Sequence, residues 1–175
     1  MRADHAGRGI GVALKLHQRQ WALERELTEI TWTFDPLASR NAYFNLVKLG
    51  ADAQEYVIDF YGDMHDGVNE GQPSDRMIAR WSLLAPLSDR ATSGAGYLPV
   101  LRLGSEGQPQ HESADSSVQR LAIGIPQDIE SLRGERPEAA RLWRHALREE
   151  MADRLQSGWR IAGFDKRGSY LLARG

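Results

Sequence analysis

Three glycines near the start of the chain, Gly7, Gly9 and Gly11, surround Arg8 and run directly into an amphipathic segment in the stretch GRGIGVALKLHQ. The N-terminus of a helix carries unpaired N–H groups and a positive dipole end, and glycines let a bulky anion approach that backbone closely. This pattern therefore favours a phosphate or pyrophosphate as the ligand. A simple turn that enters a helix is the alternative interpretation of so short a pattern.

Two common nucleotide-binding motifs do not fit these glycines. The phosphate-binding loop of many nucleotide hydrolases ends in Gly-Lys followed by Ser or Thr, and that ending is absent. The dinucleotide pattern G-x-G-x-x-G fails because Val12 or Leu14 occupies the position of its last glycine. These two motifs are therefore excluded as the explanation of the glycines.

The composition predicts a soluble globular chain with a real core and without a nucleic-acid partner. The 175 residues are 41% hydrophobic and 26% charged, and the net charge of -2 provides no basic field for nucleic acid. The absence of cysteine excludes disulfides and thiolate chemistry and is typical of a cytoplasmic protein. The five histidines show no metal-ligand spacing, and no segment has the length of a membrane span, so we expect no metal and no membrane partner.

Hydrophobic periodicity predicts alternating helices and strands in the first half of the chain. The expected elements are a helix over 10–27, a strand over 28–34, a helix over 39–49 that ends at Gly50, a strand over 55–62, a loop over 63–74 and a strand over 76–83. In the second half we expect a strand over 97–103, a surface loop over 104–117, a strand over 120–126, a long helix over 137–157 and a hairpin over 159–173.

This alternation argues for an α/β layer arrangement. We expect residues 1–84 to form one unit, residues 85–119 to be a loop-rich connection, and residues 120–175 to be an extension packed on the same domain. The tryptophans fall at core-like positions of their elements. The arginines of the long helix alternate with acidic residues, and this alternation predicts a solvated face.

The stretch GRGIGVALKLHQ resembles motif A of the GNAT acetyltransferase superfamily, whose pattern is Gln/Arg-x-x-Gly-x-Gly/Ala followed by a helix. In that superfamily the helix leads to a strand, then to a short helix with a Lys-Leu-Gly-like turn, then to another strand. The order of ITWTFDPLASRNAYFNLVKLGA and YVIDFYG is the same. Residues 5–84 are similar to an uncharacterised group of predicted GNAT acetyltransferases, and the remainder resembles that group's C-terminal extension. The fold class implied is α/β (α+β), with a GNAT-like mixed sheet flanked by helices.

The resemblance implies transfer of an acetyl group from acetyl-CoA to the amine of a small acceptor. Arg8, Gly9, Ile10 and Gly11 would cradle the pyrophosphate of acetyl-CoA with backbone N–H groups, and Gly7 would allow the turn. Two positions of this sequence depart from the pattern of the GNAT superfamily. Ala6 replaces the usual Arg or Gln, and Leu46 occupies the position where many members have a tyrosine that protonates the departing thiolate.

A complete GNAT domain has a strand, one or two helices and three further strands before motif A, and the bulged backbone of the last strand receives the thioester. The resemblance therefore implies an N-terminally truncated domain, and a start site chosen too far downstream is the explanation that we favour. The alternative function is a non-catalytic module that pairs an exposed strand edge with another chain, as in a homodimer.

The catalytic residues are the least determined part of this interpretation. Asn41 and Asn45 are four residues apart in the second predicted helix, where they would contact the acyl-CoA arm or the leaving sulfur, or serve as helix caps and surface polar groups. Asp59 lies in an otherwise apolar predicted strand, where a carboxylate is either a base with a raised pKa or a structurally paired group. The other carboxylates and histidines near strand ends that are candidate bases are Glu29, Asp63 and His65.

Overall fold

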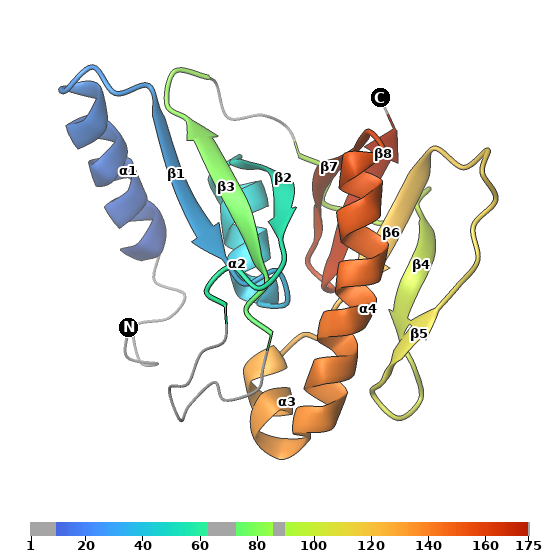
Figure 1. Cartoon of the computed structure of the whole chain (residues 1–175). Coiled ribbons are helices and arrows are strands. Elements are labelled where there is room, and N and C mark those ends of the chain that lie inside the picture. Colours follow the sequence, from blue (N-terminus) through green and yellow to red (C-terminus); the bar gives the residue numbers. More distant parts are fainter. Residues whose placement is uncertain (1–9, 63–72, 86–89, 175) are drawn as a thin grey trace.

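The structure is a computed structural model that describes residues 10–62, 73–85 and 90–174. The fold is mixed α and β, as predicted, and its strands form two separate sheets (Figure 1). Sheet A is antiparallel and has the order β1-β3-β2, while sheet B has the order β5-β4-β6-β8-β7 and is mixed because β4 and β6 are parallel. The longest helix, α4, packs against strands of both sheets.

In the first half of the chain, one helix precedes the first strand of sheet A and another follows it. Its elements are α1 (Ile10–Leu23), β1 (Glu29–Phe34), α2 (Ser39–Tyr43) with its π-helical continuation η2 (Phe44–Lys48), β2 (Asp52–Val57) and β3 (Arg76–Ser82). The second half consists of β4 (Leu98–Leu103), β5 (Pro109–His111), β6 (Arg120–Gly124), α3 (Ile129–Glu135), α4 (Pro137–Gln156), β7 (Trp159–Asp165) and β8 (Ser169–Arg174).

The predicted helices and strands occur in the expected order, but α3 and β5 were not predicted and several boundaries differ. The strand predicted over 55–62 is wrong at both ends, because β2 begins at Asp52 and ends at Val57. The chain turns immediately afterwards, with positive φ angles at Asp59 and Gly62. Residues 63–72 of the loop predicted over 63–74 lie outside the described residues. In the second half, β5 lies within the segment predicted as a loop, where Gly104 and Gly107 form the turn that pairs it with β4.

The orientation of α1 is the largest departure from expectation. Its apolar side chains were expected to face the core, yet Ala22 is its buried residue. Lys15 lies 3.7 Å from the ring centroid of Trp32 on β1, and Arg19 donates from Nε (3.0 Å) and Nη2 (2.6 Å) to the carbonyl of Leu83. Lys15 and Arg19 therefore face the body of the protein together with Ala22 and Leu23, which pack against the core. The exposed apolar residues of this segment are Ile10, Leu14, Leu16, Trp21 and Leu27.

The long helix forms much of the core and begins and ends as predicted. Pro137 occupies its first turn, where a missing N–H costs nothing, and Trp143, Leu147 and Met151 are fully buried on one side. The indole N–H of Trp143 donates to the carbonyl of Gly107 at 2.9 Å. The helix therefore fixes both the sheets and the turn before β5.

The two sheets are also joined directly beside β7. The side-chain carbonyl of Gln54 accepts from the N–H of Ile161 at 3.1 Å. The segment around Ala91 runs against Gly163 so closely that the Ala91 N–H donates to Ala162 (3.0 Å) and the Ala91 carbonyl accepts from Phe164 (2.9 Å). A side chain at residue 163 has no room there, because a Cβ would lie 1.9 Å from the Ala91 carbonyl oxygen.

We predict that Gly163→Ala lowers the free energy of unfolding by about 1–3 kcal/mol, because the added methyl group forces the Ala91 backbone away. Gly134→Ala is the matched control. Nothing lies within 4 Å of a Cβ at that position in α3, so the change should be neutral or stabilise by up to about 1 kcal/mol. Urea denaturation of both variants measures the difference, and equal stabilities would contradict the described contact.

Candidate functional site

The candidate cofactor site begins at the first turn of α1. Gly7, Arg8 and Gly9 lie outside the described residues, whereas Ile10 and Gly11 form the start of the helix. The first turn contains no acidic residue, so nothing there opposes an anion at the positive end of the helix dipole. The charge of the first turn of α1 is therefore compatible with the pyrophosphate that the resemblance places there.

Gly11 also has a packing role that needs no ligand. A Cβ at this position would lie 3.3 Å from Cε2 of Phe44, which belongs to η2. Glycine therefore lets the start of α1 approach the second helix closely. The result is a junction between the first turn of α1, which the resemblance assigns to the pyrophosphate, and the α2–η2 segment, which it places near the acyl arm.

The structure separates the two asparagines of the second helix. Asn41 is exposed on α2, whereas Asn45 is buried on η2 and its backbone carbonyl accepts from Ala51 at 2.9 Å. Asn41 borders a groove of about 380 Å³ between the starts of α2 and α3. Leu46, which the resemblance aligns with the tyrosine of many GNAT members, is fully buried. Of these residues, Asn41 alone is accessible to a ligand.

Asp59 is not a buried strand carboxylate, so that prediction is wrong. It follows the end of β2 in a left-handed conformation, with φ of 47°, and its side chain is half exposed. Its Oδ1 accepts from the Ser74 N–H at 3.3 Å and lies 3.5 Å from Nη2 of Arg148. A turn that closes the β2–β3 connection accounts for this residue. Of the other candidate bases, Glu29 is exposed at the start of β1, and Asp63 and His65 lie outside the described residues.

A buried polar cluster that the sequence analysis missed lies where α4 meets sheet A. Asp75 is 1% exposed, and it accepts from the Tyr56 hydroxyl at 2.7 Å and from Arg148 at 2.9 and 2.7 Å. Burial alone would raise the pKa of Asp75, but the hydrogen bonds from Arg148 and Tyr56 lower it below its usual value. Burial and the Asp75 charge raise the pKa of Tyr56 well above its ordinary value.

A second ion-pair cluster lies one turn earlier on α4. Arg144 is 3% exposed and donates to Asp35 at 2.8 Å, and Arg133 of α3 pairs with the same carboxylate. Burial would raise the pKa of Asp35, but Arg144 and Arg133 lower it. The Tyr170 hydroxyl donates to the adjacent Pro36 carbonyl at 2.7 Å. The predicted solvated face of α4 is therefore wrong at Arg144. Asp35 also accepts from the N–H of Leu37, as expected of a turn residue.

These two clusters are structural in character. Every carboxylate in them is already bonded to an arginine, and Asp75 and Arg144 are buried away from solvent. Perturbed pKa values mark functional sites only where a ligand can reach them. The signal that reveals the clusters in the sequence is the spacing of Arg144 and Arg148, four residues apart, beside the buried stripe of the long helix.

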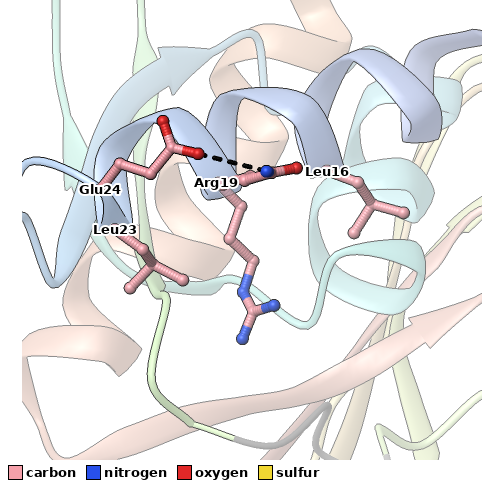
Figure 2. A pocket seen from close by; sticks show the side chains of 5 residues that line it. Leu16, Arg19, Leu23 and Glu24 are labelled. Atoms are coloured by element: carbon pink, nitrogen blue, oxygen red, sulfur yellow. Dashed lines mark hydrogen bonds between the residues drawn. The ribbon is translucent and has the colours of Figure 1, made fainter.

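The three grooves found among the described residues are not lined by Ile10 or Gly11. Leu16, Arg19, Gln20, Leu23 and Glu24 line an open groove of about 630 Å³ along α1 (Figure 2). Gln20 donates to Glu24 at 3.2 Å and Arg19 is bonded to Leu83, so the polar groups of this groove are already paired. This groove is a depression along α1, and no reactive side chains meet in it.

A third groove, of about 440 Å³, lies on sheet B beside the β7–β8 turn. Asp165 borders it and accepts from Arg167 and from the Gly94 N–H at 2.8 Å. The hydrogen bonds from Arg167 lower the pKa of Asp165 to about 2. Within residues 10–62, 73–85 and 90–174, no group of three or more His, Asp or Glu side chains is placed to hold a metal ion. No helix in the same ranges is long and apolar enough to cross a bilayer.

The comparisons with known proteins give no independent assignment. The sequence matches no family model, no curated protein and no solved structure.

We predict that Arg144→Met lowers the free energy of unfolding by about 3–5 kcal/mol, because it leaves the buried Asp35 carboxylate with one fewer partner. Arg141→Met is the matched control on the same helix. Arg141 pairs with exposed Glu138 at 3.0 Å, so its loss should change stability by less than about 1 kcal/mol. Urea denaturation measures the free energy of unfolding of both variants. A loss at Arg144→Met as small as that of the control would show that the ion pair does not hold α4 in place.

We predict that acid destabilises the wild type more than Asp165→Asn between about pH 4 and about pH 2. Folding lowers the pKa of Asp165 from 3.8 to about 2, so the unfolded chain takes up a proton first as the pH falls. The contribution of Asp165 is therefore complete above pH 4 and is lost on acidification. Thermal unfolding of both proteins across this range measures it, and parallel curves would contradict the Arg167 pairing.

Proposed function

We propose that the chain binds acetyl-CoA at the start of α1 and acts as an N-acetyltransferase on a small amine. The observation that supports the proposal is the first turn of α1, which contains no acidic residue and packs beside the second helix at Gly11. The resemblance assigns the pyrophosphate to the backbone at Arg8–Gly11 and the acyl arm to the second helix. In this proposal the pantetheine arm, which joins the diphosphate to the thioester, extends from the first turn of α1 along the second helix.

The chemistry requires little more than positioning and proton transfer. The free amine attacks the thioester carbonyl carbon, a C–N bond forms, and the C–S bond breaks to release the CoA thiolate. The acceptor must lose its ammonium proton before attack, and the thiolate must gain a proton. In this proposal the backbone N–H groups of α1 bind the diphosphate charge. Of the two asparagines of the second helix, Asn41 is the one that a ligand can contact, since Asn45 is buried.

A second candidate function is a non-catalytic module that pairs a strand edge with another chain. The observation that favours it is the outer edge of β1, which has no strand partner among the described residues. An unpaired edge exposes backbone N–H and C=O groups that can bond another strand. The two functions differ in their ligand, because the first needs acetyl-CoA and the second needs only polypeptide.

We predict that acetyl-CoA raises the melting temperature of the chain and that acetyl-pantetheine, which lacks the diphosphate, does not. A ligand that binds only the folded state adds about 2.7 kcal/mol of stability at about a hundred times its dissociation constant. Gly9→Val should abolish the shift, because the resemblance requires the phosphates to approach that backbone. Gly134→Val in α3 is the control and should keep the shift, since open space surrounds that glycine.

Release of free CoA thiol in the presence of a panel of primary amines then tests catalysis. An acetyl-CoA shift without thiol release would leave binding in place and remove the transferase step. The absence of any shift, or an equal shift in Gly9→Val, would contradict acyl-CoA binding at the glycines.

A further inference from the structure

The groove of about 380 Å³ between the starts of α2 and α3 is lined by side chains of both charges. Arg40 belongs to its α2 side, and Asp128 and Glu130 belong to its α3 side. Glu130 pairs with Arg133 at 2.9 Å, so its charge is already compensated. Arg40 and Asp128 are both exposed, and neither has an ion-pair partner among the described residues. The groove therefore offers a cation and an anion that a ligand can reach.

Asp128 stays ionised although it caps α3. Its two carboxylate oxygens accept from the N–H of Ser131 at 3.0 Å and from the Ser131 hydroxyl at 2.9 Å. These hydrogen bonds lower the pKa of Asp128, and the nearby charge of Arg40 lowers it further. Arg40 is thus close enough to act on Asp128 without bonding to it. A bound molecule can contact both side chains without displacing an existing ion pair.

A buried hydroxyl belongs to the same groove. Ser39 is only 8% exposed and lines the groove, and its side chain makes no hydrogen bond with a described residue. The residue at the N-cap of α2 is Ala38, so this hydroxyl does not serve as the helix cap. A buried hydroxyl without a partner is unfavourable, and such groups are normally bonded in native proteins. Ser39 is therefore available to a molecule that enters the groove.

We propose that this groove binds the head group of a free α-amino acid. The carboxylate of the amino acid pairs with Arg40, because a planar guanidinium can donate two parallel hydrogen bonds to a carboxylate. Its ammonium donates to Asp128 and to the Ser39 hydroxyl. Both charged groups of an α-amino acid are attached to one carbon, so they can reach both sides of one groove.

A ligand with a single charge matches this groove less well. An anion that bonds to Arg40 also lies near Asp128, and a simple amine that bonds to Asp128 also lies near Arg40. Like charges brought together at a binding site are unfavourable. A zwitterion compensates both side chains at once, and the α-amino acids are the common small molecules of this kind.

This inference concerns the groove and does not rest on acyl-CoA binding. Asn41, the accessible asparagine of the second helix, also borders the groove. An amino acid held there would therefore lie beside an acyl arm that reaches this helix. Amino-acid binding without an acetyl-CoA shift would leave the inference standing and contradict the proposed function. An acetyl-CoA shift without amino-acid binding would do the reverse.

Saturation-transfer NMR of the full chain with each of the twenty common L-amino acids tests the proposal. We expect binding of at least one amino acid, and no binding of the amine or the carboxylic acid that lacks one of its charges. For L-alanine, these two analogues are ethylamine and propionate. The absence of binding by all twenty would overturn the proposal, and so would an analogue that binds as well as the amino acid.

Variants of the two charged residues locate the binding. Arg40→Gln and Asp128→Asn should each lower the affinity for the bound amino acid by about tenfold or more, because each removes a charge-assisted hydrogen bond. Asparagine is as good an N-cap as aspartate, so α3 should stay intact, and circular dichroism checks this. Arg160→Gln and Asp115→Asn are the matched controls at exposed positions outside the groove and should bind normally. Unchanged affinity in both groove variants would contradict the assigned site.

Discussion

The ion pairs between α4 and sheet A are the interaction on which the rest of the structure depends. Arg144 and Arg148 project from one helix to Asp35 and Asp75, which lie at the end of β1 and immediately before β3. Both carboxylates are largely removed from water, so each needs its cationic partner to remain ionised. Because α4 also packs on sheet B, these pairs fix the relative position of the two sheets. Apolar burial of Trp143 then stabilises the arrangement that the charges specify.

In contrast, α1 is attached by few contacts and lies at the far end of sheet A. Gly11 on Phe44, Lys15 on Trp32 and Arg19 on Leu83 hold it while its apolar side chains face outward. The proposed acyl-CoA binding uses the first turn of this helix. The second candidate function uses the edge of β1, which has no strand partner among the described residues.

Much of the fold follows from the sequence, because periodicity and turn residues act locally. The strand EITWTF, the helix that begins at Pro137 and the final hairpin are where their patterns place them. The predictions are wrong where a contact with a residue far away in the sequence determines the orientation or burial of a side chain. Cationic contacts to Trp32 and Leu83 reverse α1, and burial of Arg144 depends on Asp35, a residue 109 positions away. Of the candidate site, the sequence predicts only a glycine pattern followed by a second helix. Local spacing cannot show that Asn45 is buried or that Asp59 lies in a turn after the end of β2.

The most direct test of acyl-CoA binding at the junction of α1 and η2 is hydrogen exchange of the full chain with and without acetyl-CoA. If the cofactor binds there, we expect slower exchange of the amides of Ile10, Gly11 and the residues from Asn41 to Phe44, with little change in sheet B. Protection confined to the groove near Asp165, or no protection anywhere, would contradict it.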